Sequence, residues 1–114
     1  MSKYHNKHTE QDGYTFDSLA ESRRYWELKA LERAGEISGL VVHPKFVLQE
    51  AVKVNGETIR AITYSPDFQY FDHNGMQVAE DVKGGKGTVT EVYKLKRKLF
   101  IVRYPNIRFE EVQA

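Results

Sequence analysis

The sequence predicts one domain of the α/β class, with the element order α-β-β-β-α-β. Two stretches with helical spacing of apolar residues enclose three extended stretches joined by hairpin turn signals, and a short β-rich stretch ends the chain. A chain of 114 residues is long enough to bury one core. Strands joined by tight turns pair antiparallel, so we expect a meander covered by helices, with a last strand reached through the second helix.

The first helix is predicted over residues 18–34. Ser18 has the residue type of an N-cap, and Glu21 stands three residues later, as in a capping box. Gly35 is expected to end the helix. Residues 1–13 are polar and show no periodicity, so we interpret them as a flexible N-terminal arm before a single domain over 14–114.

Three extended stretches follow, at residues 40–55, 58–71 and 77–83, and each is rich in β-branched or aromatic residues. Turn signals separate them, NGE at 55–57 and HNG at 73–75. We therefore expect three consecutive antiparallel strands.

The second helix is predicted from the stretch after GGKG at 84–87 to Pro105, which cannot continue a helix. A last short strand is expected at 107–112. The helix shows an apolar stripe with basic residues on the opposite face. The stripe consists of Val89, Val92, Leu95, Leu99 and Val102.

Composition and charge exclude several classes of protein function. The formal net charge is +1, so total charge does not indicate a nucleic-acid partner. The chain has no cysteine, which excludes disulfides, thiol catalysis and thiolate zinc sites. No apolar run reaches the ~20 residues that span a bilayer, and the first residues are too polar for a secretory signal. A cytoplasmic protein is expected.

The stretch EDVKG at 80–84 carries the strongest functional signal. Successive strand side chains alternate, so Asp81 and Lys83 share one face and Glu80 lies on the other. The preceding strand contains Asp67, and a hairpin of this length brings Asp67 and Asp81 to neighbouring strands. Two close carboxylates repel each other unless a cation binds between them. Lys83 could then polarise an attacking water or neutralise a phosphate, which suits phosphodiester hydrolysis.

Each of these residues also has a reading without catalysis. Asp81 and Lys83 could form a surface ion pair, and Lys83 could be an ordinary solvated lysine. Asp67 could begin a turn. Glu21 could be only the partner of Ser18, although both roles can coexist.

The motif SPD followed by EDVKG resembles the PD-(D/E)xK nuclease superfamily, whose core has the same α-β-β-β-α-β order. Five stretches are similar to a small phage and prophage family once catalogued as a domain of unknown function, itself similar to Holliday-junction resolvases and phage endonucleases. They are FDSLAESRRYWELKALERAGEI, HPKFVLQ, ITYSPDFQYF, EDVKG and YKLKRKLF. Together they cover almost the whole chain.

The resemblance implies a restriction-endonuclease-like core, with a mixed sheet and flanking helices. It also implies an endonuclease activity that depends on Mg²⁺ and in which Mn²⁺ can replace Mg²⁺. Glu21, Asp67 and Asp81 match the metal ligands, and Lys83 matches the catalytic lysine; Glu80 stays open as a replacement for Asp81. The implied substrate is DNA, branched or otherwise structured, including four-way junctions. Cleavage would release the 3′ oxygen and leave a 5′ phosphate. A homodimer, and a phage or prophage protein acting in a bacterial cell, are also implied.

Basic residues near the proposed site are candidates for DNA contacts. We select Arg23, Arg24, Lys86, Lys94, Arg97 and Lys98. His43 is a further possible ligand, although a histidine at a strand edge with no visible partner is more often structural. Two other functions stay open: a non-catalytic nucleic-acid-binding protein with a nuclease-like fold, and a structural module of a phage particle or replication complex.

Overall fold

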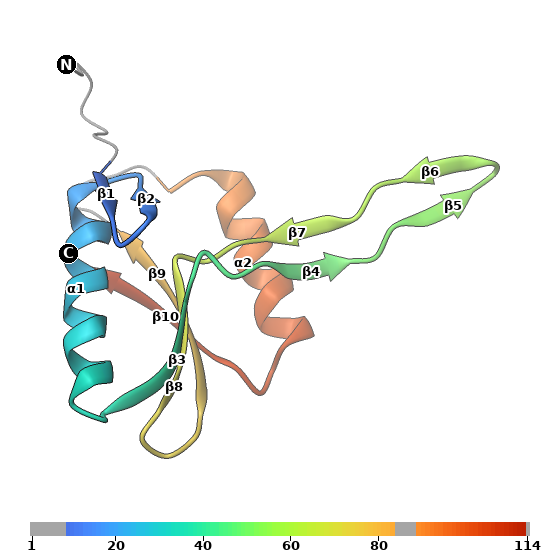
Figure 1. Ribbon diagram of the computed structural model, residues 1–114. Coiled ribbons are helices and arrows are strands. Elements are labelled where there is room, and N and C mark those ends of the chain that lie inside the picture. Colours follow the sequence, from blue (N-terminus) through green and yellow to red (C-terminus); the bar gives the residue numbers. More distant parts are fainter. Residues whose placement is uncertain (1–8, 84–88, 114) are drawn as a thin grey trace.

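The computed structural model describes residues 9–83 and 89–113. A mixed four-stranded sheet in the order β10-β9-β8-β3 lies between two helices (Figure 1). Strand β8 pairs antiparallel with both β3 and β9, and β10 runs parallel to β9. The elements are α1 (Leu19–Arg33), β3 (Ile37–Val42), β8 (Phe68–Asp72), β9 (Gln77–Lys83), α2 (Glu91–Arg103) and β10 (Arg108–Gln113). The predicted α/β class and the mixed sheet with flanking helices are confirmed.

Local sequence accounts for α1. The Ser18 hydroxyl accepts a hydrogen bond from the Glu21 backbone N–H at 3.1 Å, so the predicted N-cap is present. Gly35 follows the helix with a φ of +81°, a left-handed conformation that favours glycine. Tyr25 and Leu28 of α1 are buried against the sheet. The predicted helix over 18–34 is therefore confirmed.

The chain enters α1 through a short hairpin. It consists of β1 (Thr9–Gln11) and β2 (Tyr14–Phe16). The Tyr25 hydroxyl donates to Asp12 Oδ2 at 2.6 Å and ties the turn of this hairpin to α1. Residues 9–13 of the predicted N-terminal arm form the first strand and the turn of this hairpin, while residues 1–8 lie outside the described residues.

The first two predicted strands are a long bent hairpin with three separately paired sections. Beyond the β3–β8 pair, β4 (Phe46–Gln49) pairs with β7 (Ile62–Tyr64), and β5 (Val52–Val54) pairs with β6 (Glu57–Ile59). Residues 46–64 leave the sheet and extend away from the body; we call them the projecting hairpin (Figure 1). The bend begins at His43, where φ is +54° before Pro44, so the expected continuous strand is interrupted there.

Side chains on the two faces of the sheet form two apolar clusters. Val78 of β9 faces α1 and packs with Tyr25, Leu28 and Phe68. Ala79, the next residue, faces α2 and packs with Phe100. The alternation predicted for β9 is confirmed, and it delivers Asp81 and Lys83 to the α2 side.

Aromatic side chains form the inward face of α2. Phe100 is fully buried, and Tyr93 and Tyr104 pack against the same cluster. Most of the predicted aliphatic stripe faces solvent instead, namely Val92, Leu95, Leu99 and Val102, whereas Val89 is half-buried. Large aromatic side chains of α2 therefore fill the space over this face of the sheet. Neither described helix is long and apolar enough to cross a membrane.

Candidate metal centre

Asp67 and Asp81 meet where β8 begins and β9 ends. Phe68 pairs with Glu80 in the antiparallel register, so the preceding Asp67 lies opposite Asp81. Asp67 Oδ2 accepts the backbone N–H of Val82 at 2.7 Å, and the Asp67 N–H donates to the carbonyl of Glu80 at 2.9 Å. The structure thus brings together the two acids that the sequence predicted to be neighbours.

Lys83 completes the group on the α2 side. Its Nζ lies 3.9 Å from Asp81 Oδ2 and 3.5 Å from the centroid of the Tyr93 ring. The Tyr64 hydroxyl, from the base of the projecting hairpin, donates to the same carboxylate oxygen, Asp81 Oδ2. The two tyrosines therefore position the carboxylate and the amine from β9.

Glu21 reaches the same end of the sheet from α1. Its Oε2 lies 2.6 Å from Nε2 of His43, which stands just past the end of β3. The His43 N–H also donates to the carbonyl of Asp67 at 2.9 Å, extending the β3–β8 ladder by one bond. Glu21 consequently serves two purposes: its backbone N–H takes part in the cap of α1, and its buried carboxylate points into the cluster.

Three of these side chains offer ligand atoms to a common point. One oxygen of Glu21, one oxygen of Asp67 and a ring nitrogen of His43 lie within 4.8 Å of one another. Asp67 also forms a side-chain hydrogen bond with Asp81. Glu21, Asp67 and Asp81 therefore form a continuous row of acids from α1 to β9. Carboxylate oxygens suit Mg²⁺ and Mn²⁺, whereas an imidazole nitrogen adds preference for first-row transition metals. The donor set fits a divalent cation.

Electrostatics support the same reading. Burial, a hydrogen bond with Asp81 and the charge of Asp81 raise the pKa of Asp67 to about 9. Burial also raises the pKa of Glu21, against the opposing effect of its bond to His43. The Asp67–Asp81 pair therefore favours holding a proton at neutral pH, and a bound cation would replace that proton.

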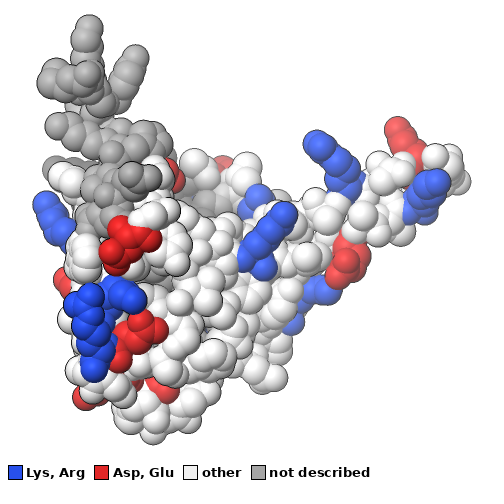
Figure 2. All heavy atoms as spheres, in the orientation of Figure 1, with Lys and Arg blue, Asp and Glu red and all other residues white. Residues whose placement is uncertain are grey.

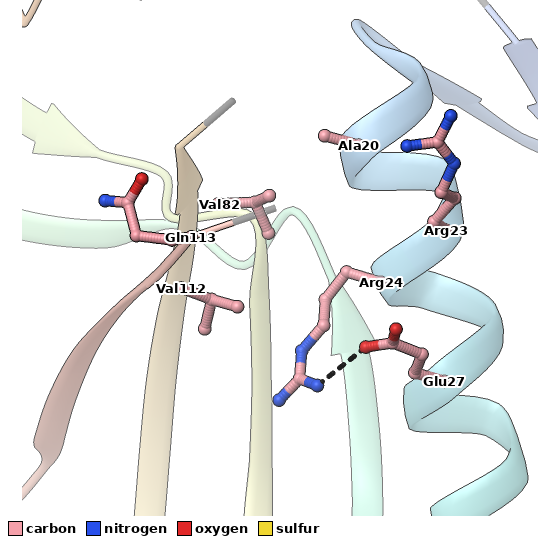
Figure 3. Close-up of a pocket in the computed structure, with 7 residues that line it drawn as sticks. All are labelled: Ala20, Arg23, Arg24, Glu27, Val82, Val112 and Gln113. Carbon is pink, nitrogen blue, oxygen red and sulfur yellow. Dashed lines mark hydrogen bonds and ion pairs between the residues drawn. The ribbon is translucent and has the colours of Figure 1, made fainter. Parts of the chain in front are cut away.

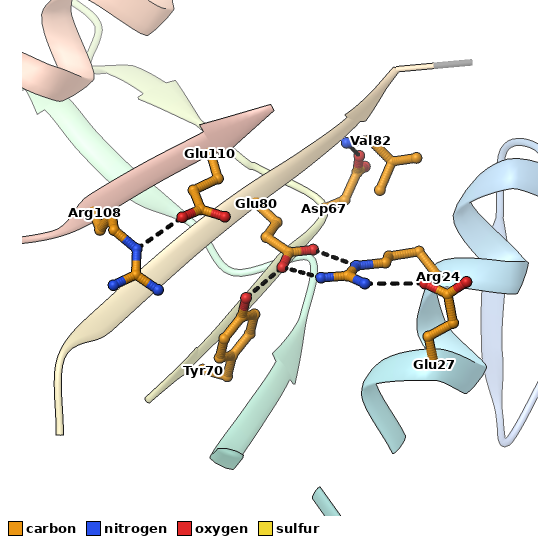
Figure 4. A network of polar contacts seen from close by, with 8 residues as sticks. All are labelled: Arg24, Glu27, Asp67, Tyr70, Glu80, Val82, Arg108 and Glu110. Carbon is orange, nitrogen blue, oxygen red and sulfur yellow. Dashed lines mark hydrogen bonds and ion pairs between the residues drawn. The ribbon is translucent and has the colours of Figure 1, made fainter. Parts of the chain in front are cut away.

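Glu80 belongs to a separate network on the α1 side (Figure 4). The Arg24 guanidinium donates to both of its carboxylate oxygens, at 2.8 and 2.6 Å, and the Tyr70 hydroxyl donates to Oε2. A fully buried carboxylate with these partners is neutralised internally. The geometry favours Asp81 over Glu80 as the acid of the cluster, and it gives Arg24 an internal partner instead of a free surface position.

A pocket of about 210 Å³ lies between α1 and the ends of β9 and β10 (Figure 3). It is smaller than the roughly 300–1,000 Å³ typical of small-molecule sites. Its lining residues are Ala20, Arg23, Arg24, Glu27, Val82, Val112 and Gln113. Arg24 also contacts Glu27 at 2.9 Å, so part of its charge is compensated within the pocket. We therefore place the candidate chemistry at the row of acids.

The comparison with protein families gives a match over residues 1–113 to the family described as "Protein of unknown function (DUF1064)". The chain belongs to the DUF1064 family. No curated protein and no solved structure showed a significant match to it.

The basic residues proposed for DNA contact occupy different settings in this DUF1064 protein. Arg23 and Lys98 are exposed, and no acidic partner is seen for either among the described residues. Lys94 pairs with Glu91 at 3.2 Å, and Arg97 is bound to Glu111. Lys86 lies outside the described residues. Figure 2 shows charges of both signs along the projecting hairpin, without a single-sign face in this view.

The sequence did not reveal the contact that His43 makes in the site. The residue ranked as structural because no partner was visible in the chain. The partner, Glu21, lies 22 residues earlier on a helix that packs across the sheet. A histidine followed by proline at a strand end was the available signal, and it does not identify the contact. The roles of Tyr64 and Tyr93 were also missed.

Proposed function

We propose that this protein is a divalent-cation-dependent endonuclease that hydrolyses phosphodiester bonds of DNA. The observation that carries the proposal is the convergence of ligand atoms from Glu21, His43 and Asp67. Asp81 is hydrogen-bonded to Asp67, and Lys83 lies beside Asp81. A row of acids with one carboxyl held protonated is suited to receive a cation. The element order and the SPD and EDVKG motifs support a restriction-endonuclease-like, PD-(D/E)xK type of core.

The position of each residue in the site suggests its role. Glu21, Asp67 and Asp81 would hold Mg²⁺ or Mn²⁺, and His43 adds a nitrogen donor to the set. A cation bound there supplies a Lewis acid that activates water and stabilises charge on the phosphate. Lys83, held by the Tyr93 ring, donates hydrogen bonds to the phosphate or to the attacking water. Resemblance to the superfamily suggests release of the 3′ oxygen and a 5′ phosphate product.

The proposed substrate is DNA, branched or otherwise structured, as in four-way junctions. This part rests on similarity to resolvases and phage endonucleases. The exposed Arg23 is available for phosphate contacts, which make binding sensitive to salt. The projecting hairpin is a two-stranded ribbon, an element that the major groove of DNA can admit.

Cleavage of a substrate panel tests the function. Junction, flap, duplex and single-stranded DNA would be incubated with Mg²⁺ or Mn²⁺ and wild-type protein, Asp81→Asn, Lys83→Met or Glu80→Gln. We expect cleavage by wild type and loss of at least about 100-fold in the first two variants. Glu80→Gln preserves the shape of a side chain outside the acid row, and activity should persist in the folded variant. Salt-sensitive DNA binding without cleavage of any substrate would instead favour a non-catalytic DNA-binding protein.

A further inference from the structure

An exposed aliphatic stripe runs along α2. Val92, Leu95, Leu99 and Val102 are 63, 59, 37 and 78% exposed, on the side of the helix opposite Phe100. Their spacing of three, four and three residues is that of a coiled-coil seam. Four aliphatic side chains aligned in water along a helix of 13 residues indicate a surface that another helix covers.

We propose that this stripe packs against the same stripe of a second copy of the chain, with the two α2 helices antiparallel. A two-fold interface requires a surface that is complementary to itself. The spacing of the stripe reads the same in both directions. A two-fold axis near residue 97 therefore sets Val92 against Val102 of the second copy, and Leu95 against Leu99 of the second copy.

Charges on one flank of the stripe complement each other in this arrangement. Glu91 has a side chain that is 90% exposed, and it would face Lys98 of the second copy, which lacks an acidic partner among the described residues. On the other flank, Lys96 would approach Arg103 of the second copy, whose charge Glu50 already offsets at 3.4 Å. Antiparallel helices also place their opposite macrodipole ends side by side.

The projecting hairpin extends this surface. Arg103 contacts Glu50, and the Tyr104 hydroxyl donates to the carbonyl of Val47 at 2.7 Å, so the base of the hairpin is fixed at the end of α2. The antiparallel pair brings the start of the second α2 to this base. Further out, β5 and β6 share an exposed apolar face made of Val52, Val54 and Ile59.

The aliphatic stripe of α2 and the apolar face of the projecting hairpin are both expected to pack against another protein surface. A two-stranded ribbon alone is only marginally stable in water. A stable dimer buries about 800 Å² on each partner, which is more than four helix side chains supply. The stripe of α2 and the apolar face of the projecting hairpin together form the interface, and it does not depend on the proposed catalysis.

Sedimentation of the full chain across micromolar concentrations tests the dimer. We expect a monomer–dimer equilibrium whose dissociation constant rises at least about tenfold in Leu95→Glu. Leu31→Glu changes an exposed leucine of α1 in the same way and should leave the equilibrium unchanged. Thermal unfolding establishes that each variant is folded. A wild-type chain that stays monomeric, or an equal effect of both substitutions, would overturn the proposal.

Disulfide trapping tests the orientation, because the natural chain has no cysteine. Val92→Cys and Val102→Cys proteins, distinguished by a tag, would be mixed and mildly oxidised. The antiparallel pair predicts that the mixed disulfide dimer forms in clear excess over either homotypic dimer. A dominant Val92→Cys homotypic dimer would contradict the arrangement.

Discussion

Arg24 and Glu80 form a two-point ion pair that joins α1 to β9, with Nε–Oε1 and Nη2–Oε2 distances of 2.8 and 2.6 Å. Glu80 has no exposed surface. Its neighbour Asp81 faces the other side of the sheet, where Asp67 stands beside it and Lys83 lies 3.9 Å away. Adjacent acids on one strand thus have different surroundings: Glu80 is neutralised within the fold, and Asp81 lies beside Asp67 and Lys83 in the proposed metal site.

Removal of Arg24 should destabilise the protein strongly. Arg24→Ala leaves the buried Glu80 carboxylate without its charged partner, and we expect a loss of about 3 kcal/mol in the free energy of unfolding. Urea denaturation at neutral pH measures the loss. The matched control is Arg23→Ala, which removes an exposed arginine one position earlier and should cost no more than about 0.5 kcal/mol. Similar values for the two variants would refute the structural role of the pair.

The stability of the cation-free protein should fall as pH rises from about 4 to about 9. The pKa of Asp67 is raised to about 9 in the folded protein from an ordinary 3.8. The folded state therefore keeps a proton that the unfolded chain has lost, and each pH unit in this window removes up to about 1.4 kcal/mol. Asp67→Asn should flatten this slope in chemical denaturation with a chelator present. Asp72→Asn, at the end of β8, should leave the slope over pH 4–9 unchanged, because hydrogen bonds from backbone N–H groups lower the pKa of Asp72 from its ordinary value of 3.8.

Binding of Mn²⁺ should release a proton. Asp67 is protonated at pH 7.5, and coordination requires the carboxylate, so affinity should rise about tenfold per pH unit up to about pH 9. Calorimetry in buffers of different protonation enthalpy counts the released protons. Near one proton per ion is expected for wild type. An affinity that is independent of pH between 6 and 8 would contradict this coupling.

His43 should influence which cation is preferred. Its imidazole nitrogen favours transition metals over Mg²⁺, so His43→Ala should weaken Mn²⁺ binding by about tenfold or more and Mg²⁺ binding much less. Competition between the two ions, followed by the Mn²⁺ paramagnetic signal, measures the ratio. His73→Ala, in an exposed turn, serves as the control. An equal loss for both ions would show that His43 acts only through its contact with Glu21.

The Tyr93 ring should position Lys83 for catalysis. Tyr93→Leu removes the ring that lies 3.5 Å from the ammonium, and we expect kcat to fall about tenfold while Mn²⁺ affinity stays within about twofold. Tyr93→Phe keeps the ring and loses only the hydroxyl bond to Glu111. It should remain close to wild type. Equal loss in both variants would assign the effect to that hydroxyl bond.

Local signals explain the parts of the fold that could be predicted. Ser18 and Gly35 determine the ends of α1 within one turn of sequence. The turn between β8 and β9 determines the register that sets Asp67 beside Asp81. Both features depend on residues close to each other in the chain, so pattern and spacing were sufficient.

Features that depend on packing could not be predicted. The contact of Glu21 with His43 requires the position of α1 across the sheet and a positive φ at His43. In α2, an aromatic face with Phe100 and an aliphatic stripe with Leu95 are both apolar. The pattern alone does not say which of them a neighbouring element covers. The departure of the projecting hairpin from the sheet has the same origin in tertiary structure.

Mn²⁺ binding measured by electron paramagnetic resonance at pH 8 tests the central claim most directly, with wild type, Asp67→Asn, Asp81→Asn and the surface control Glu110→Gln. Convergence of the acids predicts a bound ion in wild type and in the control, and affinity at least about 100-fold weaker in the two aspartate variants. If wild type takes up no Mn²⁺, or the aspartate variants bind it as tightly as wild type, these side chains do not form a metal centre.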